Sequence, residues 1–163
     1  MSRVYNFVIS IHYTVDNIVI KYIDIAKEMC ILNIVSSTVF ASNAVHAYHK
    51  EEYIYGTIFS MLVLSSWCYH YIADHTSYFY WIDQGVITLV VIYGFYLIFQ
   101  KKIRKENVFC HIVIVATISI VVTLYYYGSF NGIFCHHPEF GTWYHSMVHC
   151  FGSVGHHAIL CLV

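Results

Sequence analysis

The sequence predicts an all-α protein, a polytopic bundle of about five transmembrane helices. Of its 163 residues, 59% are apolar and only 10% are charged, whereas a typical soluble domain has about 25% charged residues. In addition, five apolar segments each approach or exceed the roughly 20 residues with which a helix crosses a bilayer. These two observations predict a chain embedded in a lipid bilayer.

The predicted spans follow one another with short connections. They cover residues 29–48, 53–72, 77–99, 108–127 and 141–163. Before them, residues 4–26 place an apolar stripe at helical spacing, with Asp16, Lys21 and Asp24 on other faces. This pattern predicts an amphipathic helix at the membrane interface, and a sixth span is the alternative. The chain thus divides into an N-terminal segment, 1–28, and a helical bundle, 29–163.

The charged residues indicate orientation and exclude one class of partner. Short cytosolic loops collect Lys and Arg, and the loop after the third span contains Lys101, Lys102, Arg104 and Lys105. This loop and the C-terminus are therefore predicted to be cytosolic. The chain has 8 basic and 9 acidic residues and no glycine-rich phosphate loop, so we expect no nucleic-acid partner.

Five polar residues are predicted to meet near the non-cytosolic face. Ser66 and His70 lie near the end of the second span, Asp83 near the start of the third, and His145 and His149 near the start of the fifth. Ser66 and His70 are four residues apart, as are the last two histidines, so each pair shares a helix face. Because the second span runs opposite to the third and fifth, all five residues fall at a similar depth.

Three imidazoles from two helices can hold Zn²⁺ and leave its fourth position open for water. Zinc lowers the pKa of such a water to about 7. Asp83 is then the candidate general base, and Ser66 is placed to hydrogen-bond the water or a developing oxyanion. His156 shares the face of His149 but lies about 10 Å deeper by helix rise, too far to join the same metal. The pattern predicts a hydrolase.

Each part of this pattern also has a structural interpretation. With 12 histidines in the chain, a pair four residues apart arises readily by chance. A serine near a helix end commonly bonds its own backbone. An aspartate in a membrane helix can form a structural pair with a neighbouring histidine. The combination at one depth favours a functional site.

The order of these motifs resembles the CREST superfamily of membrane hydrolases, which includes alkaline ceramidases, Per1-like GPI-remodelling proteins and myomaker-related proteins. The segment SSWCYH, residues 65–70, looks most like the ceramidase form of the first motif, and Asp83 follows His70 by 13 residues, close to the spacing of that branch. The segment HSMVH, residues 145–149, with GSVG after it, is more similar to the myomaker-related branch.

The resemblance implies a seven-helix bundle with zinc on His70, His145 and His149, a water positioned by Asp83 and Ser66, and hydrolysis of a lipid amide or ester. This chain is shorter, because only one span separates Asp83 from His145 where the family has three helices. The resemblance also implies a membrane of the endoplasmic reticulum or Golgi, with the site on the non-cytosolic side; a bacterial or virus-infected host membrane is the alternative for another source.

Three functions remain open at the level of sequence, beside a fourth that the pattern favours least, a proton or ion carrier. The first is a zinc-dependent hydrolase that cleaves the amide of a ceramide-like membrane lipid. The second is cleavage of a lipid ester of the GPI-remodelling type. The third is a non-catalytic, receptor-like or fusion-related membrane protein whose zinc site is structural.

Overall fold

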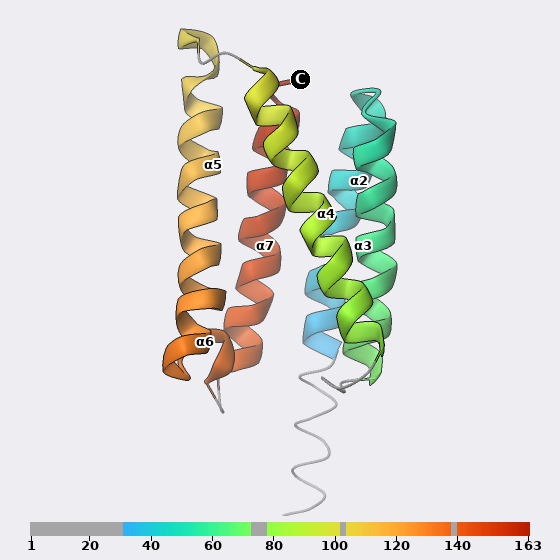
Figure 1. Cartoon of the computed structure of the whole chain (residues 1–163), viewed down its shortest axis with the longest axis vertical. Coiled ribbons are helices and arrows are strands. Elements are labelled where there is room, and N and C mark those ends of the chain that lie inside the picture. The colour runs from blue at the N-terminus through green and yellow to red at the C-terminus, as the bar shows by residue number, and fades with distance from the viewer. Residues whose placement is uncertain (1–30, 73–77, 102–103, 138–139) are drawn as a thin grey trace, which may run out of the picture.

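The computed structural model describes residues 31–72, 78–101, 104–137 and 140–163, and the regular elements in these ranges are all helical. The α-helices are α2 (Phe40–His49), α3 (Tyr53–Ile72), α4 (Tyr78–Gln100), α5 (Val108–Val121), α6 (Gly128–Asn131) and α7 (Gly141–Leu160) (Figure 1). Two 3₁₀ turns, η1 (Lys105–Asn107) and η3 (Phe134–His136), and a π-helical segment, η2 (Val122–Tyr127), connect them. The all-α prediction is confirmed.

Four of the predicted spans agree with helices to within a few residues, but the described part of the chain contains only two helices that are long and apolar enough to cross a membrane. These are Tyr78–Gln100 and the continuous helix Lys105–Tyr127. The predicted amphipathic helix or sixth span lies in residues 1–28, outside the described residues.

The predicted span 29–48 is not one straight helix. Residues 31–37 are helical, a turn follows at Thr38 and Val39, and α2 then begins. The hydroxyls of Ser36, Ser37 and Thr38 donate to backbone carbonyls three or four residues earlier. Hydroxyls that bond back onto their own helix compete with its backbone ladder and bend it. The run VSSTV, residues 35–39, therefore accounts for the interruption.

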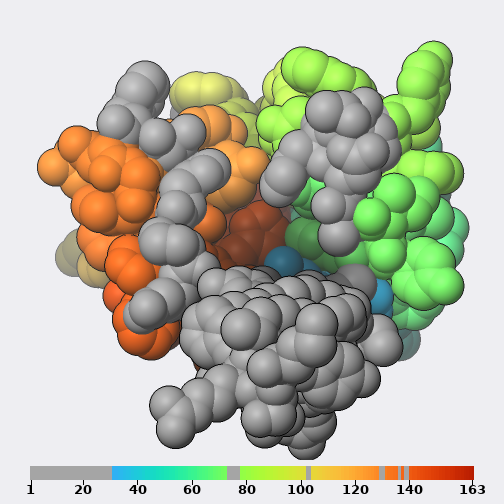
Figure 2. Space-filling view, turned by 90° about the horizontal axis from the view of Figure 1, so that it is seen from below, coloured from blue at the N-terminus to red at the C-terminus, as the bar shows by residue number. Residues whose placement is uncertain are grey.

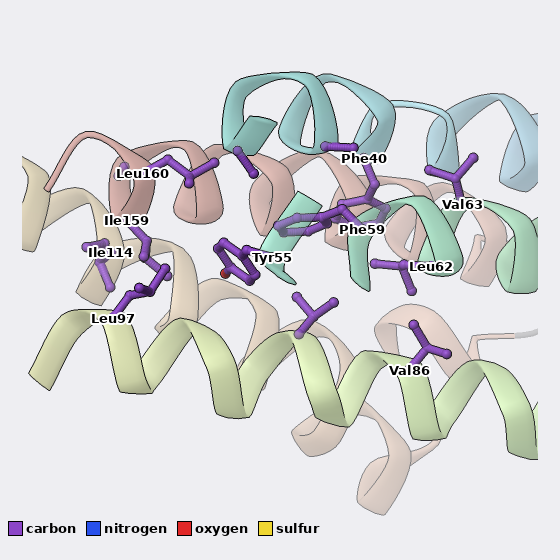
Figure 3. Packing of buried hydrophobic residues seen from close by; sticks show 14 residues of the cluster. Phe40, Tyr55, Phe59, Leu62, Val63, Val86, Leu97, Ile114, Ile159 and Leu160 are labelled. Carbon is purple, nitrogen blue, oxygen red and sulfur yellow. The ribbon is translucent and has the colours of Figure 1, made fainter. Parts of the chain in front are cut away.

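The helices run side by side along the long axis of the molecule (Figure 1). Helix α3 packs between α2 and α4, and α7 packs against α5 and α2. The core consists mainly of large apolar side chains from α2, α3, α4 and α7 (Figure 3). At its centre the rings of Phe40 and Phe59 stack with centroids 6.2 Å apart, beside the fully buried Tyr55.

Polar side chains connect α2 to α7 within this apolar core. Asn43 and Ser153 exchange two hydrogen bonds: Asn43 Nδ2 donates to the Ser153 carbonyl at 2.9 Å, and Ser153 Oγ donates to Asn43 Oδ1 at 2.6 Å. Nearer the C-terminal end of α7, His157 bonds both Ser42 and His46. Such bonds hold helices together where the surroundings are apolar, and they fix the position of α7 relative to the N-terminal helices.

Small residues let α5 and α7 approach closely, which gives a stability prediction. A Cβ at Gly155 would lie 2.5 Å from Thr117 Oγ1, whereas a Cβ at Gly85 would meet nothing within 4 Å. Gly155→Ala is therefore expected to destabilise the protein by about 1–3 kcal/mol through overpacking. Gly85→Ala is expected to be neutral or slightly stabilising. Thermal unfolding in detergent measures both, and equal melting temperatures would contradict the α5–α7 packing.

Candidate metal site

The three predicted histidines lie together where α3 ends and α7 begins. His70 is on the last turns of α3, and His145 and His149 are on successive turns of α7. One nitrogen from each ring lies within 4.8 Å of the other two, and the ring centroids are 4.6 to 5.5 Å apart. Two nitrogens on one tetrahedral zinc are separated by about 3.4 Å, so small side-chain rotations bring this trio to ligand geometry.

The hydrogen bonds of His149 select the ring nitrogen that faces the cluster. Ser36 Oγ donates its one proton to the Asn33 carbonyl at 3.1 Å, and it lies 2.8 Å from His149 Nδ1. When the hydroxyl proton is given to the Asn33 carbonyl, Ser36 accepts the second bond from Nδ1–H. In neutral His149 the lone pair is then on Nε2. A ligating histidine usually donates its other N–H to such a partner.

Asp83 lies on α4 beside the histidine cluster and is only 3% exposed. Its Oδ1 accepts two hydrogen bonds, from Ser65 Oγ at 2.8 Å and from Ser66 Oγ at 2.6 Å. We predicted that the Ser66 hydroxyl contacts the water or an oxyanion. In the structure it donates to Asp83, because α3 and α4 pack closely enough to bring the carboxylate within hydrogen-bond distance of this hydroxyl.

A cavity of about 120 Å³ adjoins Asp83, His145 and His149. Its walls come from α2, α3, α4, α5, η2 and α7, and they are mainly apolar, with Leu62, Ile87, Val90, Val91, Val121 and Val148 among them. Viewed from the site end, Figure 2 shows a hollow between α3 and α4 on one side and η2 and α6 on the other. The π-helical segment η2 contributes Tyr125, whose ring lies 5.9 Å from that of His145. Such segments recur at functional sites.

The structure brings all five predicted site residues to one end of the bundle, and it adds others. His156, which we predicted to be too deep, is absent from the cluster. Sequence reasoning missed Ser65, although it stands beside Ser66 in the same motif. It also missed Ser36 and Tyr125, which are distant in sequence and have no spacing that relates them to a histidine pair.

Comparisons with known proteins identify no relative of this chain. No protein-family model, no curated protein and no solved structure matches it.

The bond from His149 to Ser36 gives a prediction for metal affinity. Ser36→Ala removes the acceptor that orients the imidazole, and loss of such a partner typically costs 10- to 100-fold in metal affinity. We expect the zinc dissociation constant to rise by about that factor, measured by competition with a chromogenic chelator. Ser37→Ala is the matched control, because Ser37 bonds only the Ile34 carbonyl. Equal affinities in the two variants would show that Ser36 does not support the site.

Proposed function

We propose that this protein is a zinc-dependent integral membrane hydrolase that cleaves the amide bond of a ceramide-like lipid. The observation that carries the proposal is a cluster of three imidazoles, two of which line one largely apolar cavity together with a hydroxyl-bound carboxylate. A structural zinc site is typically closed by four protein ligands. Here the described residues supply three, and the space beside them is a cavity.

His70, His145 and His149 would hold the zinc. Their nitrogens are close enough to share one ion, and the donor set of three neutral imidazoles is typical of catalytic zinc. When bound there, zinc supplies a Lewis acid and makes water acidic enough to lose a proton near neutral pH. His149 would have the tautomer that this role needs when Ser36, 2.8 Å from its Nδ1, accepts from Nδ1–H.

Asp83 would act as the general base. Ser65 and Ser66 both bond Oδ1, so the carboxylate is held in one orientation beside the cavity, where it would accept a proton from water. The same carboxyl group can then return the proton to the leaving amine. Ser66 therefore serves to orient Asp83, and the oxyanion would be stabilised at the metal end of the cavity.

The outer surface supports a membrane-embedded bundle of more than two spans. Many large apolar residues on the middle of the helices are about half or more exposed, including Val45, Leu64, Ile92, Ile112, Val115 and Val154. The three tryptophans of the chain, Trp67, Trp81 and Trp143, are all exposed at the site end. Tryptophan concentrates at membrane–water interfaces, which would place the site at the depth of lipid headgroups.

The charged residues support an orientation with the site on the non-cytosolic side. Apart from Asp83, the charged residues that the structure describes all lie at the end opposite the histidines: Lys50, Glu51, Glu52, Lys101, Arg104, Lys105 and Glu106. Basic residues gather in cytosolic loops. A lipid would then present its scissile bond from the outer or lumenal leaflet while its chains remain in the bilayer.

Hydrolysis of defined lipids tests this function. The purified full-length protein, loaded with zinc and reconstituted in phosphatidylcholine vesicles, is expected to release fatty acid from ceramide, detected by mass spectrometry. Release should stop with a chelator and return with added zinc. Diacylglycerol and a GPI-anchored peptide serve as ester substrates in parallel. Cleavage of the ester substrates but not of ceramide would show that the protein is a lipid ester hydrolase and not an amide hydrolase. If zinc-bound protein cleaved neither ceramide nor the esters, the hydrolase function would be contradicted.

A further inference from the structure

Two histidines connect the ends of α2 and α7, beyond the candidate metal site. Nδ1 of His46, in the last turn of α2, lies 2.8 Å from Nδ1 of His157, in the last turn of α7. The ring centroids are 5.1 Å apart, and this distance exceeds the nitrogen separation by no more than the radii of the two rings. The two nitrogens therefore point at each other. We call this pair the histidine clasp; the adjacent His156 bonds Tyr55 instead.

The two facing nitrogens of the histidine clasp can share only one proton. At 2.8 Å one Nδ1 donates an N–H and the other accepts it, because N–H groups on both would point at each other. The Ser42 hydroxyl lies 2.6 Å from the Val39 carbonyl and 2.9 Å from His157 Nε2. When its proton is given to that carbonyl, the hydroxyl accepts from His157 Nε2–H. His157 Nδ1 then accepts from His46 Nδ1–H.

This arrangement limits the charge that the closed clasp can carry. His46 can gain a proton at Nε2 and keep its bond to His157. His157 cannot gain one in place, because its second proton would lie on Nδ1, opposite the N–H of His46. A second charge would also be repelled by Lys50 and by a protonated His49 of α2, which both act on His46; on α7, Cys161 is an exposed thiol one turn beyond. The closed clasp thus holds one positive charge, whereas two separated imidazoles hold two.

No acidic group offsets this charge among the residues that the structure describes. Neither ring of the clasp forms an ion pair with a carboxylate there. Glu51 is exposed in the turn after α2, and Glu52 accepts a hydrogen bond from the Tyr93 hydroxyl of α4 at 3.2 Å. The next link between α2 and α7, Asn43 with Ser153, contains no titratable group. Acid is therefore expected to act on the clasp and to leave this link in place.

We infer that the histidine clasp is an acid-sensitive switch that joins the ends of α2 and α7 near neutral pH and releases them when both rings are protonated. The released state binds one proton more than the closed state, so the closed state is most stable above about pH 6.5, where a free imidazole is half protonated, and loses stability below it. The ratio of released to closed protein is expected to rise about tenfold from pH 7.5 to pH 5.5. Neither zinc nor lipid takes part, so the inference is independent of the proposed function.

The pH dependence of thermal unfolding tests the switch in the full-length protein in detergent. A tenfold ratio is about 1.4 kcal/mol, or about 3–6 °C in melting temperature for a chain of this length. Between pH 7.5 and pH 5.5, wild type is expected to lose that much more than His157→Gln, because glutamine keeps a donor and an acceptor but takes up no proton. His49→Gln is the matched control: His49 is exposed on the same end of α2, and its variant should keep the wild-type pH dependence.

Two further measurements complete the test. The comparison is made with and without a chelator, so that zinc binding does not contribute to the difference. Nuclear magnetic resonance of ¹⁵N-labelled histidine then reads the protons on each ring, with His46→Gln as the second variant if His157→Gln fails to fold. Two fully charged rings at pH 5.5, in wild type that melts as it does at pH 7.5, would overturn the inference. So would equal loss of melting temperature in wild type and in either folded glutamine variant.

Discussion

Wild-type protein purified in detergent is expected to carry about one zinc ion per chain, and a His145→Ala, His149→Ala double variant is expected to carry almost none. The physical reason is that the double variant leaves one imidazole of the three that lie within reach of one another. A single neutral nitrogen ligand cannot compete with water and chelators for zinc. Inductively coupled plasma mass spectrometry on protein of known concentration measures the ratio.

The control for this experiment is His111→Ala. His111 is on α5, where its Nδ1 lies 2.9 Å from the Asn107 carbonyl, and it is outside the histidine cluster. The control should retain full zinc. Zinc should also leave the wild type as the pH is lowered, because protons compete for the imidazole nitrogens. Well-folded wild type that binds no zinc at neutral pH would contradict the metal site and, with it, the hydrolase.

The second large effect is expected for Asp83→Asn. The amide has the shape of the carboxylate and its Oδ1 can still accept from Ser65 and Ser66, so the local packing should persist. It cannot take a proton from water, and loss of a general base typically lowers a rate by 10²- to 10⁴-fold. We expect ceramide hydrolysis to fall by about that factor while zinc content stays at the wild-type value.

The comparison of rate with metal content distinguishes catalysis from structure. Gly85→Ala, on the same helix, meets open space and should leave both quantities unchanged. If Asp83→Asn also lost zinc or failed to fold, Asp83 would be a structural partner of the site. If it kept both zinc and the full hydrolysis rate, another group would be the base. Ser65→Ala with Ser66→Ala should give a smaller loss of rate, because the carboxylate remains but is less well oriented.

Part of the candidate site could be predicted because helix geometry alone relates its residues. Ser66 and His70, and likewise His145 and His149, are four residues apart, and that spacing places each pair on one face whatever the rest of the chain does. Alternating helix direction then brings the end of α3 to the starts of α4 and α7. The strongly apolar composition predicted an all-α chain for a similar reason, since a helix satisfies its own backbone hydrogen bonds in lipid.

The contacts between helices could not be predicted in this way. Ser36 is 113 residues from His149, and nothing in the spacing of either segment indicates that they meet. The donation from Ser66 to Asp83 depends on how closely α3 and α4 pack. The turn at Thr38 follows from local hydrogen-bond competition, and hydropathy detects neither this turn nor the π-helical turns at η2.

The sequence by itself determined the helical class, the bounds of four of the five long helical segments to within a few residues, and the end of the bundle at which the polar residues gather. These depend on composition and on spacing within one helix. Only the tertiary structure decided which serine orients His149, which hydroxyls hold Asp83, and that His156 pairs with Tyr55. Those features depend on the rotation and separation of packed helices, and in a chain this apolar the hydropathy pattern is nearly the same on every helix face.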